Sequence, residues 1–556
     1  MSSRAFSSLC LFVLISSVLL YSINSKGSVN SNSSHSLDSF SSAYSQYNDF
    51  LAFAGNDYGY DGQINTLREK EFPHLKKDVY LDYAGAGIPP RTLAQNIFDL
   101  LTSSTLGNPH TKSPSSSRST QGVSASRAAV LKHFNADPDH WTVVFTSGTT
   151  AGIKLLADGL PWTSNSLFMY TIDNHVSVLG IREQVKYNNG SFKGVHFPDV
   201  LDHVKAHNSK LSAQNLNHVT NLFAFPAQSN FAGNRYPLDI INEIYKDCDA
   251  KGVKRWEILL DAASLASCCS VDLSSLENSP GFLPVSFYKI FGYPTGLGAL
   301  VAKKSALADV SPRFFGGGTV TAVIPDGDWE VKRGLEYARL EYGTISFTDI
   351  MLLSKGFEFL ESLGMHNIAR HTMSLTYWLA DKLASLQHSN GQPVVKIYGN
   401  FNQTHAVMPG STGQGPIIAF SVCDSNGNLV SHSKVLDKCY DHGISVRAGC
   451  VCNHGSCFYT SGITHEDVIA RMKRGCSCDD NCCGSIPKLQ GTNDDVIEKK
   501  IEEINQITND CWSDFYPERK FAAIVRASIG FPTTFDDVAA LVQVIEQEFK
   551  DYSEML

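Results

Sequence analysis

The chain has 556 residues, which exceeds what one hydrophobic core usually serves, so two structural domains with appended segments are expected. Hydrophobic residues make up 43% and charged residues 18%, a composition that excludes a generally disordered chain. The net charge of -9 is spread along the sequence and no cluster of Lys and Arg stands out, which argues against a nucleic-acid-binding surface.

Residues 1–25 have the features of a secretory signal, because Arg4 precedes an apolar run at residues 9–21. The run is shorter than the roughly 20 residues that span a bilayer, which favours a signal peptide. No small-x-small cleavage site follows, so an uncleaved signal anchor stays open. We expect the secretory pathway or an extracellular location, with membrane attachment only if the segment is retained and the cytoplasm as the alternative.

The remaining chain is expected to fall into three parts. Residues 26–60 are rich in Ser and Asn near their start and should form a flexible segment. Residues 61–346 should form a large domain. Residues 347–556 should form a smaller α+β domain with a Cys-rich insertion around residues 476–520.

Short apolar runs alternate with helix-length amphipathic segments through the large domain. The runs at residues 142–146, 167–170, 219–225, 256–260 and 298–301 are typical of strands buried on both faces, and helices are expected at 153–160 and 238–246. This alternation predicts an α/β fold with a mostly parallel sheet covered by helices. In the smaller domain, helices are expected at 354–386 and 534–549 and strands at 417–422 and 523–529.

Two strand ends carry polar residues of interest, because parallel strands bring such ends to one edge of a sheet. A Thr-Ser-Gly-Thr-Thr turn at residues 146–150, which contains Gly148 and Thr149, precedes a helix whose N–H groups and dipole suit a phosphate. An ordinary helix cap is the alternative. Asp261 ends another strand, where a carboxylate can keep a pyridine nitrogen protonated. A capping carboxylate is again the alternative.

Lys289 lies among Phe and Tyr side chains at residues 286–293. Apolar surroundings lower the pKa of an amine and make it nucleophilic, as a Schiff base with an aldehyde coenzyme requires. His175 follows a predicted strand and can stack on a flat coenzyme ring, although a lone His is often structural. A phosphate site, a pyridine partner and this lysine together indicate pyridoxal 5′-phosphate (PLP).

The order of these residues resembles fold type I PLP enzymes of the class V aminotransferase and cysteine desulfurase group, over roughly residues 80–549. Ordinary cysteine desulfurases have a His immediately before the Schiff-base Lys, whereas this sequence has Tyr288. The segment around this lysine, residues 286–298, is similar to molybdenum cofactor sulfurases, as are Leu-Gly-Asn-Pro-His at 106–110 and Phe-Phe-Gly-Gly-Gly at 314–318. The resemblance implies the fold of type I PLP-dependent transferases and a PLP-dependent cysteine desulfurase acting on L-cysteine.

The resemblance also implies roles for single residues. Thr149 and Ser286 would contact the coenzyme phosphate, and Asn230 would hydrogen-bond its phenolic oxygen. Arg526 would bind the substrate carboxylate, a role that suits a planar bidentate donor. Thr344 matches the segment that reaches the phosphate of a neighbouring subunit, so a homodimer is implied.

Cys452 occupies the position of the family's nucleophile, within Val-Arg-Ala-Gly-Cys-Val-Cys-Asn at residues 446–453. By resemblance, its thiolate sits on a mobile loop, takes sulfur from L-cysteine as a persulfide and leaves L-alanine, while Arg447 lowers the thiol pKa. A structural disulfide or a zinc ligand is the alternative for Cys452. In an extended loop Cys450 would point the same way, because neighbours two apart share a face.

The sequence leaves several alternatives open. The chain ends at Leu556 without the C-terminal β-rich domain of full molybdenum cofactor sulfurases, so we expect that domain to be absent and the sulfur acceptor stays unknown. A PLP-dependent lyase or aminotransferase acting on another amino acid is the alternative function. Disulfides and zinc both remain open for four further cysteines, Cys476, Cys478, Cys482 and Cys483, and no metal is assigned.

Overall fold

The computed structural model describes residues 45–210, 220–251, 256–274, 279–401, 408–473 and 524–553. The chain divides into two units, Met1–Phe53 and Ala54–Leu556, and every feature below belongs to the second. Within the described ranges, no helix combines the length and the apolar character needed to cross a bilayer. The predicted signal, residues 1–25, and the cysteines from Cys476 to Cys483 lie outside those ranges.

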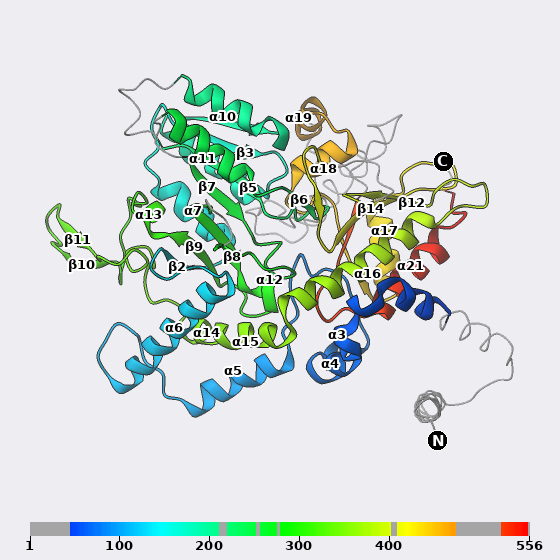
Figure 1. Ribbon diagram of the computed structural model, residues 1–556, viewed down its shortest axis with the longest axis horizontal. Helices are drawn as coiled ribbons and strands as arrows, with labels where there is room; N and C mark the ends of the chain where they lie inside the picture. Colours follow the sequence, from blue (N-terminus) through cyan, green and yellow to red (C-terminus); the bar gives the residue numbers. More distant parts are fainter. Residues whose placement is uncertain are drawn as a thin grey trace, which may run out of the picture. The chain divides into compact units, whose positions relative to one another are not determined.

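The sheet predicted for residues 61–346 is present, and it has seven strands (Figure 1). Its strands run in the order β2 (Trp141–Thr146), β9 (Gly298–Lys303), β8 (Phe282–Ser286), β7 (Glu257–Asp261), β5 (Leu222–Pro226), β3 (Leu167–Thr171) and β4 (Ser191–Val195). Strand β9 is antiparallel to both neighbours and the other pairings are parallel. The five predicted strands are all present and almost entirely buried.

Strands β8 and β4 were not predicted, for two different reasons. The centre of β8 holds Pro284, a residue that lacks an N–H group and is rare in central strands. Strand β4 is an edge strand of which only Val195 is buried, so it lacks an apolar run. The sheet is therefore mostly parallel, as expected, but two strands wider than the sequence indicated.

Helices cover both faces of this sheet, because alternate residues of each strand enter different cores. One core joins Val143, Phe223 and Leu260 to helices such as α6 and α11, and the other joins Val144, Leu222 and Leu259 to α7 and α9. The helices of this part are α4 (Ile64–Glu71), α5 (Arg91–Ser103), α6 (Pro114–His133), α7 (Thr149–Gly159), α8 (Val176–Leu179), α9 (Ile181–Tyr187), α10 (Val200–Asn208), α11 (Ile240–Lys251), α12 (Phe287–Phe291), α13 (Lys304–Leu307), α14 (Phe347–Met351) and α15 (Leu353–Leu363).

The smaller sheet is antiparallel and has the order β12 (Val395–Tyr398), β14 (Ile417–Val422), β17 (Val525–Ser528) and β16 (Arg447–Ala448). Both strands predicted in this region, at 417–422 and 523–529, are present. The other helices are α16 (Met365–Ser385), α17 (His432–Asp441), α18 (His454–Ser461), α19 (His465–Lys473) and α21 (Phe535–Phe549). Helices α16 and α17 pack against this sheet, and α21 packs against both helices.

The helical pattern expected at 354–386 forms two helices, α15 and α16, which are separated at Gly364 with φ 81°. Helices α14 and α15 pack on α6 beside the large sheet, and α16 continues to the smaller sheet (Figure 1). Helix α21 matches the predicted range and begins with a capping box between Thr534 and Asp537. The domain boundary at residue 346 stays a prediction.

Short elements complete the fold and several of them join distant segments. They are η1 (Gly55–Asp57), α3 (Gly59–Gly62), η2 (Pro73–Lys76), η3 (Phe197–Asp199) and the paired strands β1 (Val79–Tyr80) with β15 (Ile444–Ser445), β6 (Asn234–Arg235) with β13 (Gly413–Gln414) and β10 (Val320–Val323) with β11 (Glu330–Lys332). Residues 55–60 were expected in a flexible segment. They are instead ordered, since the Gly59 N–H donates to His371 and the Tyr60 hydroxyl donates to the Phe531 carbonyl.

Candidate active site

A cavity of about 200 Å³ opens at the carboxyl ends of the parallel strands. Fourteen residues line it, and seven of them are predicted site residues: Gly148, Thr149, His175, Asn230, Asp261, Ser286 and Lys289. These residues come from segments up to 141 positions apart in the sequence, as their numbers show. The structure therefore gathers the predicted coenzyme-binding set in one place.

The phosphate side of the cavity lies at the start of α7. Gly148 caps this helix with φ 122°, a conformation that favours glycine. The Ser286 hydroxyl accepts a hydrogen bond from the Thr149 N–H at 2.9 Å, and the two side-chain oxygens lie 2.8 Å apart. Backbone N–H groups at a helix start and two hydroxyls suit a phosphate group.

Lys289 is placed by the short helix α12, which begins directly after strand β8. The helix ends at Gly292, whose φ of 86° is left-handed, and a Cβ atom there would lie 2.2 Å from the Pro89 nitrogen. The Gly87 N–H donates to the Tyr288 carbonyl, so the residue 84–89 segment packs along this helix. This packing fixes the direction in which the lysine enters the cavity.

Burial shifts the pKa values of Lys289 and Asp261 in opposite directions, and each shift favours the neutral form of the group. Burial lowers the pKa of the Lys289 amine, and the nearby Asp261 carboxylate opposes that shift. Burial likewise raises the pKa of Asp261, while a hydrogen bond from the Ala263 N–H (3.0 Å) lowers it. The amine is thus easier to deprotonate than a surface lysine, as Schiff-base formation requires.

His175 lines the same cavity as the N-cap of α8. Its Nδ1 atom accepts a hydrogen bond from the Ser177 N–H at 3.1 Å. Burial lowers its pKa to about 4, and the Lys289 charge adds to this shift, so the ring is neutral at neutral pH. A neutral imidazole can stack on an aromatic coenzyme and exchange a proton with it.

The segment that carries Cys452 is held against this cavity. The N–H of Val176, next to His175, donates to the Cys452 carbonyl at 2.9 Å. Asn230 donates from its side-chain amide to the Val451 carbonyl at 2.7 Å and accepts a hydrogen bond from Asn453 at 3.1 Å. The Asn230 amide therefore contacts this segment in the structure, whereas the resemblance implied a contact to the coenzyme's phenolic oxygen.

Cys452 has a free, partly exposed thiol, whereas Cys450 is fully buried in a disulfide with Cys457. The backbone is not extended here, because Val451 and Cys452 have φ values of 44° and 60°. The expectation that both thiols point the same way is therefore wrong. Among the described residues, no group of three or more His, Cys, Asp or Glu is arranged to hold a metal ion.

Both predicted substrate-binding arginines contact one carboxylate, that of Asp82. Arg526 is 3% exposed and donates to Asp82 Oδ1 at 2.6 Å and to the Asn230 carbonyl at 2.8 Å. Arg447 donates from Nε to Asp82 Oδ2 at 3.0 Å. Neither arginine lines the small cavity, but the positive charges of both lower the pKa of Lys289, which places them near it.

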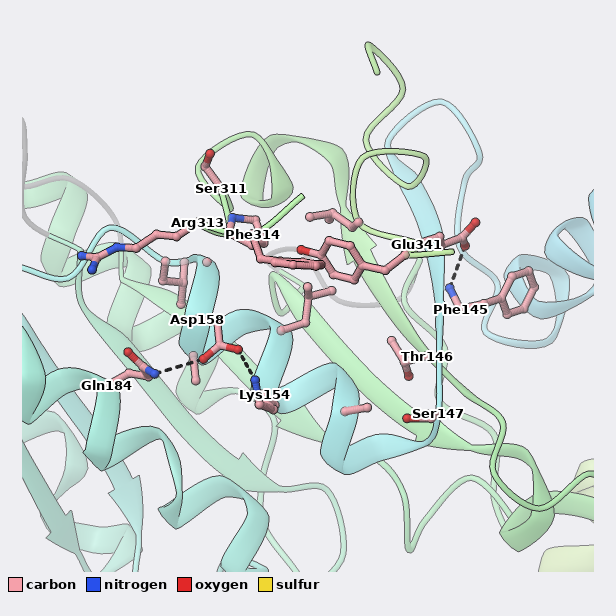
Figure 2. A pocket seen from close by; sticks show the side chains of 18 of the residues that line it. Phe145, Thr146, Ser147, Lys154, Asp158, Gln184, Ser311, Arg313, Phe314 and Glu341 are labelled. Carbon is pink, nitrogen blue, oxygen red and sulfur yellow. Dashed lines mark hydrogen bonds and ion pairs between the residues drawn. The ribbon is translucent and has the colours of Figure 1, made fainter. Parts of the chain in front are cut away.

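Thr344 is the one predicted coenzyme-binding residue far from this arrangement. Its side chain is exposed, accepts a hydrogen bond from Asn108 Nδ2 at 3.2 Å and does not line the cavity. It adjoins a larger cavity of about 940 Å³, to which Ile345 and Ser346 contribute. Figure 2 shows this larger cavity, with Phe314 and Arg313 on one side and the paired side chains of Lys154, Asp158 and Gln184 below.

The smaller cavity is the better candidate active site, because it contains an amine, a carboxylate, an imidazole and a helix start. The larger one has Phe314, Leu340 and Tyr342 in its wall, and its Lys154 and Asp158 pair with one another. Sequence reasoning missed Gln228 and Ser264 in the smaller cavity, and Asp82 and Asn453 beside it.

The residues of the smaller cavity fit PLP. The Asp261 side chain is 6% exposed and shares the cavity with Lys289. Asp261 would therefore contact the pyridine nitrogen, and Lys289 would contact the aldehyde carbon. Thr149 and Ser286 offer hydroxyls at the helix start, and a Cβ atom on Gly298 would lie 2.6 Å from Gly148 Cα. The backbone at Gly148 and Gly298, beside this helix start, is therefore packed too closely to admit a side chain on Gly298.

Comparisons with known proteins agree with this site. The chain is 38% identical over 435 residues to a molybdenum cofactor sulfurase from Bos taurus (76% of this chain, 48% of that protein). It is 37% identical over 501 residues to one from Homo sapiens (88% of this chain, 52% of that protein). The chain therefore spans about half the length of these curated relatives.

Solved structures share the fold and confirm the predicted fold class. An apo cysteine desulfurase from Thermococcus onnurineus NA1 matches with a TM-score of 0.61 at 18% identity, covering 87% of this chain and 97% of that one. The cysteine desulfurase CsdA from Escherichia coli matches with a TM-score of 0.61 at 19% identity, covering 87% and 98%. The family model described as aminotransferase class-V matches residues 79–461, and the chain belongs to that family.

Proposed function

We propose that this chain is a PLP-dependent cysteine desulfurase that takes sulfur from L-cysteine onto Cys452 and releases L-alanine. The observation that carries the proposal is a joint one. Lys289 and His175 line one cavity, and the main chain of Cys452 is hydrogen-bonded to Val176, the residue next to His175. The similarity to molybdenum cofactor sulfurases over 76–88% of this chain supports the same assignment.

The residues around the cavity divide the work of binding and proton transfer. PLP, when bound, supplies a protonated ring that stabilises negative charge on the substrate carbon. Asp261 keeps the ring nitrogen protonated, and Thr149 and Ser286 hold the phosphate. Lys289 provides the amine that binds the coenzyme and exchanges a proton with the substrate carbon.

Arg526 and Asp82 set the place of the substrate carboxylate. Arg526 is buried, and its guanidinium is oriented by Asp82 and by the Asn230 carbonyl. A substrate carboxylate binds this guanidinium in competition with Asp82, or beside it. Asp82 thereby acts as a positioning residue that favours small amino acids carrying one carboxylate, because a second carboxylate would meet its charge.

Cys452 completes the reaction as a nucleophile. Its thiolate attacks the sulfur of the bound cysteine, an S–S bond forms and the C–S bond breaks. The carbon fragment takes up a proton and leaves as L-alanine, so sulfur remains as a persulfide on Cys452. Hydrogen bonds from Asn230 and Val176 to the main chain at residues 451 and 452 hold the thiol close to the cavity.

Product analysis tests the proposal directly. Purified protein loaded with PLP and given L-cysteine and a reducing thiol should release L-alanine and sulfide in equal amounts. A lyase of the same fold would instead form pyruvate and ammonia. Pyruvate without alanine would overturn the desulfurase assignment and favour the lyase.

We also propose a homodimer. Thr344 is exposed beside the larger cavity, and Phe314 (69% exposed), Trp329 (52%) and Leu335 (57%) present apolar side chains in the same part of the sequence. Exposed apolar side chains concentrated in this way are typical of an interaction surface. Coverage of this surface by a second copy would bring a Thr344 side chain towards the partner's phosphate site.

Entry into the secretory pathway is proposed from the features of residues 1–25. The disulfide between Cys450 and Cys457 supports it, because disulfides persist in oxidising compartments. Expression of the full chain in a eukaryotic cell, followed by N-terminal sequencing of the mature product, tests this. Recovery of the intact N-terminus in the cytosolic fraction would contradict it.

A further inference from the structure

Two adjacent cysteines, Cys268 and Cys269, lie on the turn that follows strand β7 and have no role in the proposed reaction. The turn begins at Ala262, one residue after Asp261, and its main chain closes on Leu265, whose carbonyl accepts from the N–H groups of both cysteines. The Cys268 side chain is 3% exposed and Cys269 is partly exposed. The pair therefore has one inner and one outer thiol.

Arg235, on strand β6, points its guanidinium at both sulfurs. Its Nη2 lies 3.1 Å from Cys269 Sγ and 3.7 Å from Cys268 Sγ. Its remaining contacts are to the neutral Gln228 Oε1, at 2.9 Å from Nε and 2.7 Å from Nη2. Within the described ranges, Arg235 forms no ion pair with a carboxylate, so the two cysteine sulfurs are the groups in contact with it that can carry a compensating negative charge as a thiolate.

The charge distribution assigns that thiolate to Cys269. A hydrogen bond from the Cys268 thiol lowers the pKa of Cys269, and the Arg235 charge lowers it further, against the opposing effect of burial. The same hydrogen bond and burial raise the pKa of Cys268. A partly exposed thiolate beside a protonated thiol is the arrangement of an attacking and a resolving cysteine.

We propose that Cys268 and Cys269 form a redox-reactive dithiol that is oxidised by hydrogen peroxide to a disulfide. The Cys269 thiolate attacks the peroxide oxygen, the O–O bond breaks, and hydroxide leaves and takes up a proton to form water. The Cys268 sulfur then attacks the Cys269 sulfenic acid, an S–S bond replaces the S–O bond, and a second water leaves with the Cys268 proton. In sum, two thiols lose two electrons and one peroxide gives two waters.

Oxidation of this pair reaches the candidate active site through Gln228. This side chain lines the cavity, accepts from Arg235 and donates to the Ser264 hydroxyl (3.2 Å). Disulfide formation removes the anionic partner of Arg235. The Arg235 guanidinium then bonds mainly to Gln228. This change shifts the Gln228 side chain, which lines the cavity.

Peptide mapping after limited oxidation tests the proposal without reference to enzyme activity. Full-length holoenzyme is treated with hydrogen peroxide, remaining thiols are alkylated, and peptides are quantified by mass spectrometry. A disulfide joining Cys268 and Cys269 should form before the buried thiols Cys423 and Cys439 change. In Cys268→Ser, a dimedone adduct should accumulate on Cys269, and in Cys269→Ser, position 268 should stay reduced.

Arg235 variants separate a charge effect from simple exposure. Arg235→Gln should slow alkylation of Cys269 by iodoacetamide about twofold at pH 7 and about fivefold at pH 6, because loss of the cation raises the thiol pKa by about one unit from about 6 and the thiolate fraction falls accordingly. Arg235→Lys should keep most of the rate, which guards against misfolding as the cause. Equal rates in the wild-type protein and Arg235→Gln, or no Cys268–Cys269 disulfide in the oxidised wild-type protein, would overturn the proposal.

Discussion

The side-chain amide of Asn453 donates a hydrogen bond to the main-chain carbonyl of Asp173 at 2.7 Å, across 280 positions of sequence. Asn453 is fully buried and follows Cys452, while Asp173 lies two residues before His175. The same amide donates to Ser229 Oγ at 3.2 Å. One buried side chain therefore ties the thiol segment to two loops that build the cavity.

Asn453→Ala should lower kcat for alanine release while PLP binding persists. Loss of several buried hydrogen bonds should also reduce the free energy of unfolding by about 1–3 kcal/mol. Steady-state kinetics, coenzyme absorbance and thermal melting measure the three effects. Asn96→Ala removes an exposed amide that bonds only its own helix, and it is the matched control. Unchanged kcat in a destabilised Asn453→Ala would limit Asn453 to a structural role.

Lys289→Ala should abolish the covalently held yellow chromophore, because Lys289 is the amine that lines the cavity. Borohydride reduction of the wild-type holoenzyme, followed by peptide mapping, should place the pyridoxyl group on Lys289. Lys154→Ala, on the surface of α7 in an ion pair with Asp158, should retain the colour. A pyridoxyl group on any other lysine would sink this assignment.

Cys452→Ser should bind PLP and L-cysteine, seen as a change in coenzyme absorbance, yet release no alanine. The reason is that only C–S cleavage needs the thiolate. Cys450→Ser should lose far less activity, but it opens the disulfide to Cys457 and should lower the melting temperature. Wild-type turnover by Cys452→Ser would show that the desulfurase mechanism is wrong.

Light scattering should give twice the mass of one chain for the active enzyme. Phe314→Asp, which places a charge on a side chain that is 69% exposed beside the larger cavity, should shift the protein towards monomer and weaken PLP retention. Tyr440→Asp changes a residue that is 84% exposed elsewhere and should leave the mass unchanged. A fully active monomer would contradict the dimer.

His371 should make the fold sensitive to acid. Its Nδ1 accepts from the Gly59 N–H and its Nε2 donates to the Thr533 carbonyl, so the ring is bonded in its neutral form. Burial lowers its pKa to about 3 from an ordinary value of 6.5. The unfolded chain therefore takes up the proton first, and stability that is complete above pH 6.5 is lost as the pH falls towards 3.

Between pH 6.5 and about pH 5, this one group should cost about 2 kcal/mol. Melting temperatures at pH 7.5 and pH 5 should differ less in His371→Gln than in the wild-type protein. His140→Gln, at a side chain that is 79% exposed, should keep the wild-type difference. An unchanged pH dependence in His371→Gln would show that other groups control it.

The sequence predicts much of this molecule, because its central strands are buried on both faces and leave continuous apolar runs. Asp261 and His175 could be placed together for the same reason, since each follows such a strand, whereas Lys289 was identified from its Phe and Tyr neighbours. Strand β8 was hidden by Pro284. Asp82 and Asn453 could not be found, because their importance rests on partners that the chain meets only after folding.

The hydrogen bond from the Val176 N–H to the Cys452 carbonyl limits how sulfur can leave the enzyme. With the peptide group of Cys452 pinned at the cavity, and Cys450 held by its bond to Cys457, the side-chain torsion of Cys452 is the main freedom left to a persulfide. This arrangement argues against a long mobile loop that carries sulfur away from the cavity. In the proposed reaction, a recipient would have to bring its nucleophile to the mouth of the cavity, so sulfur delivery would depend on docking.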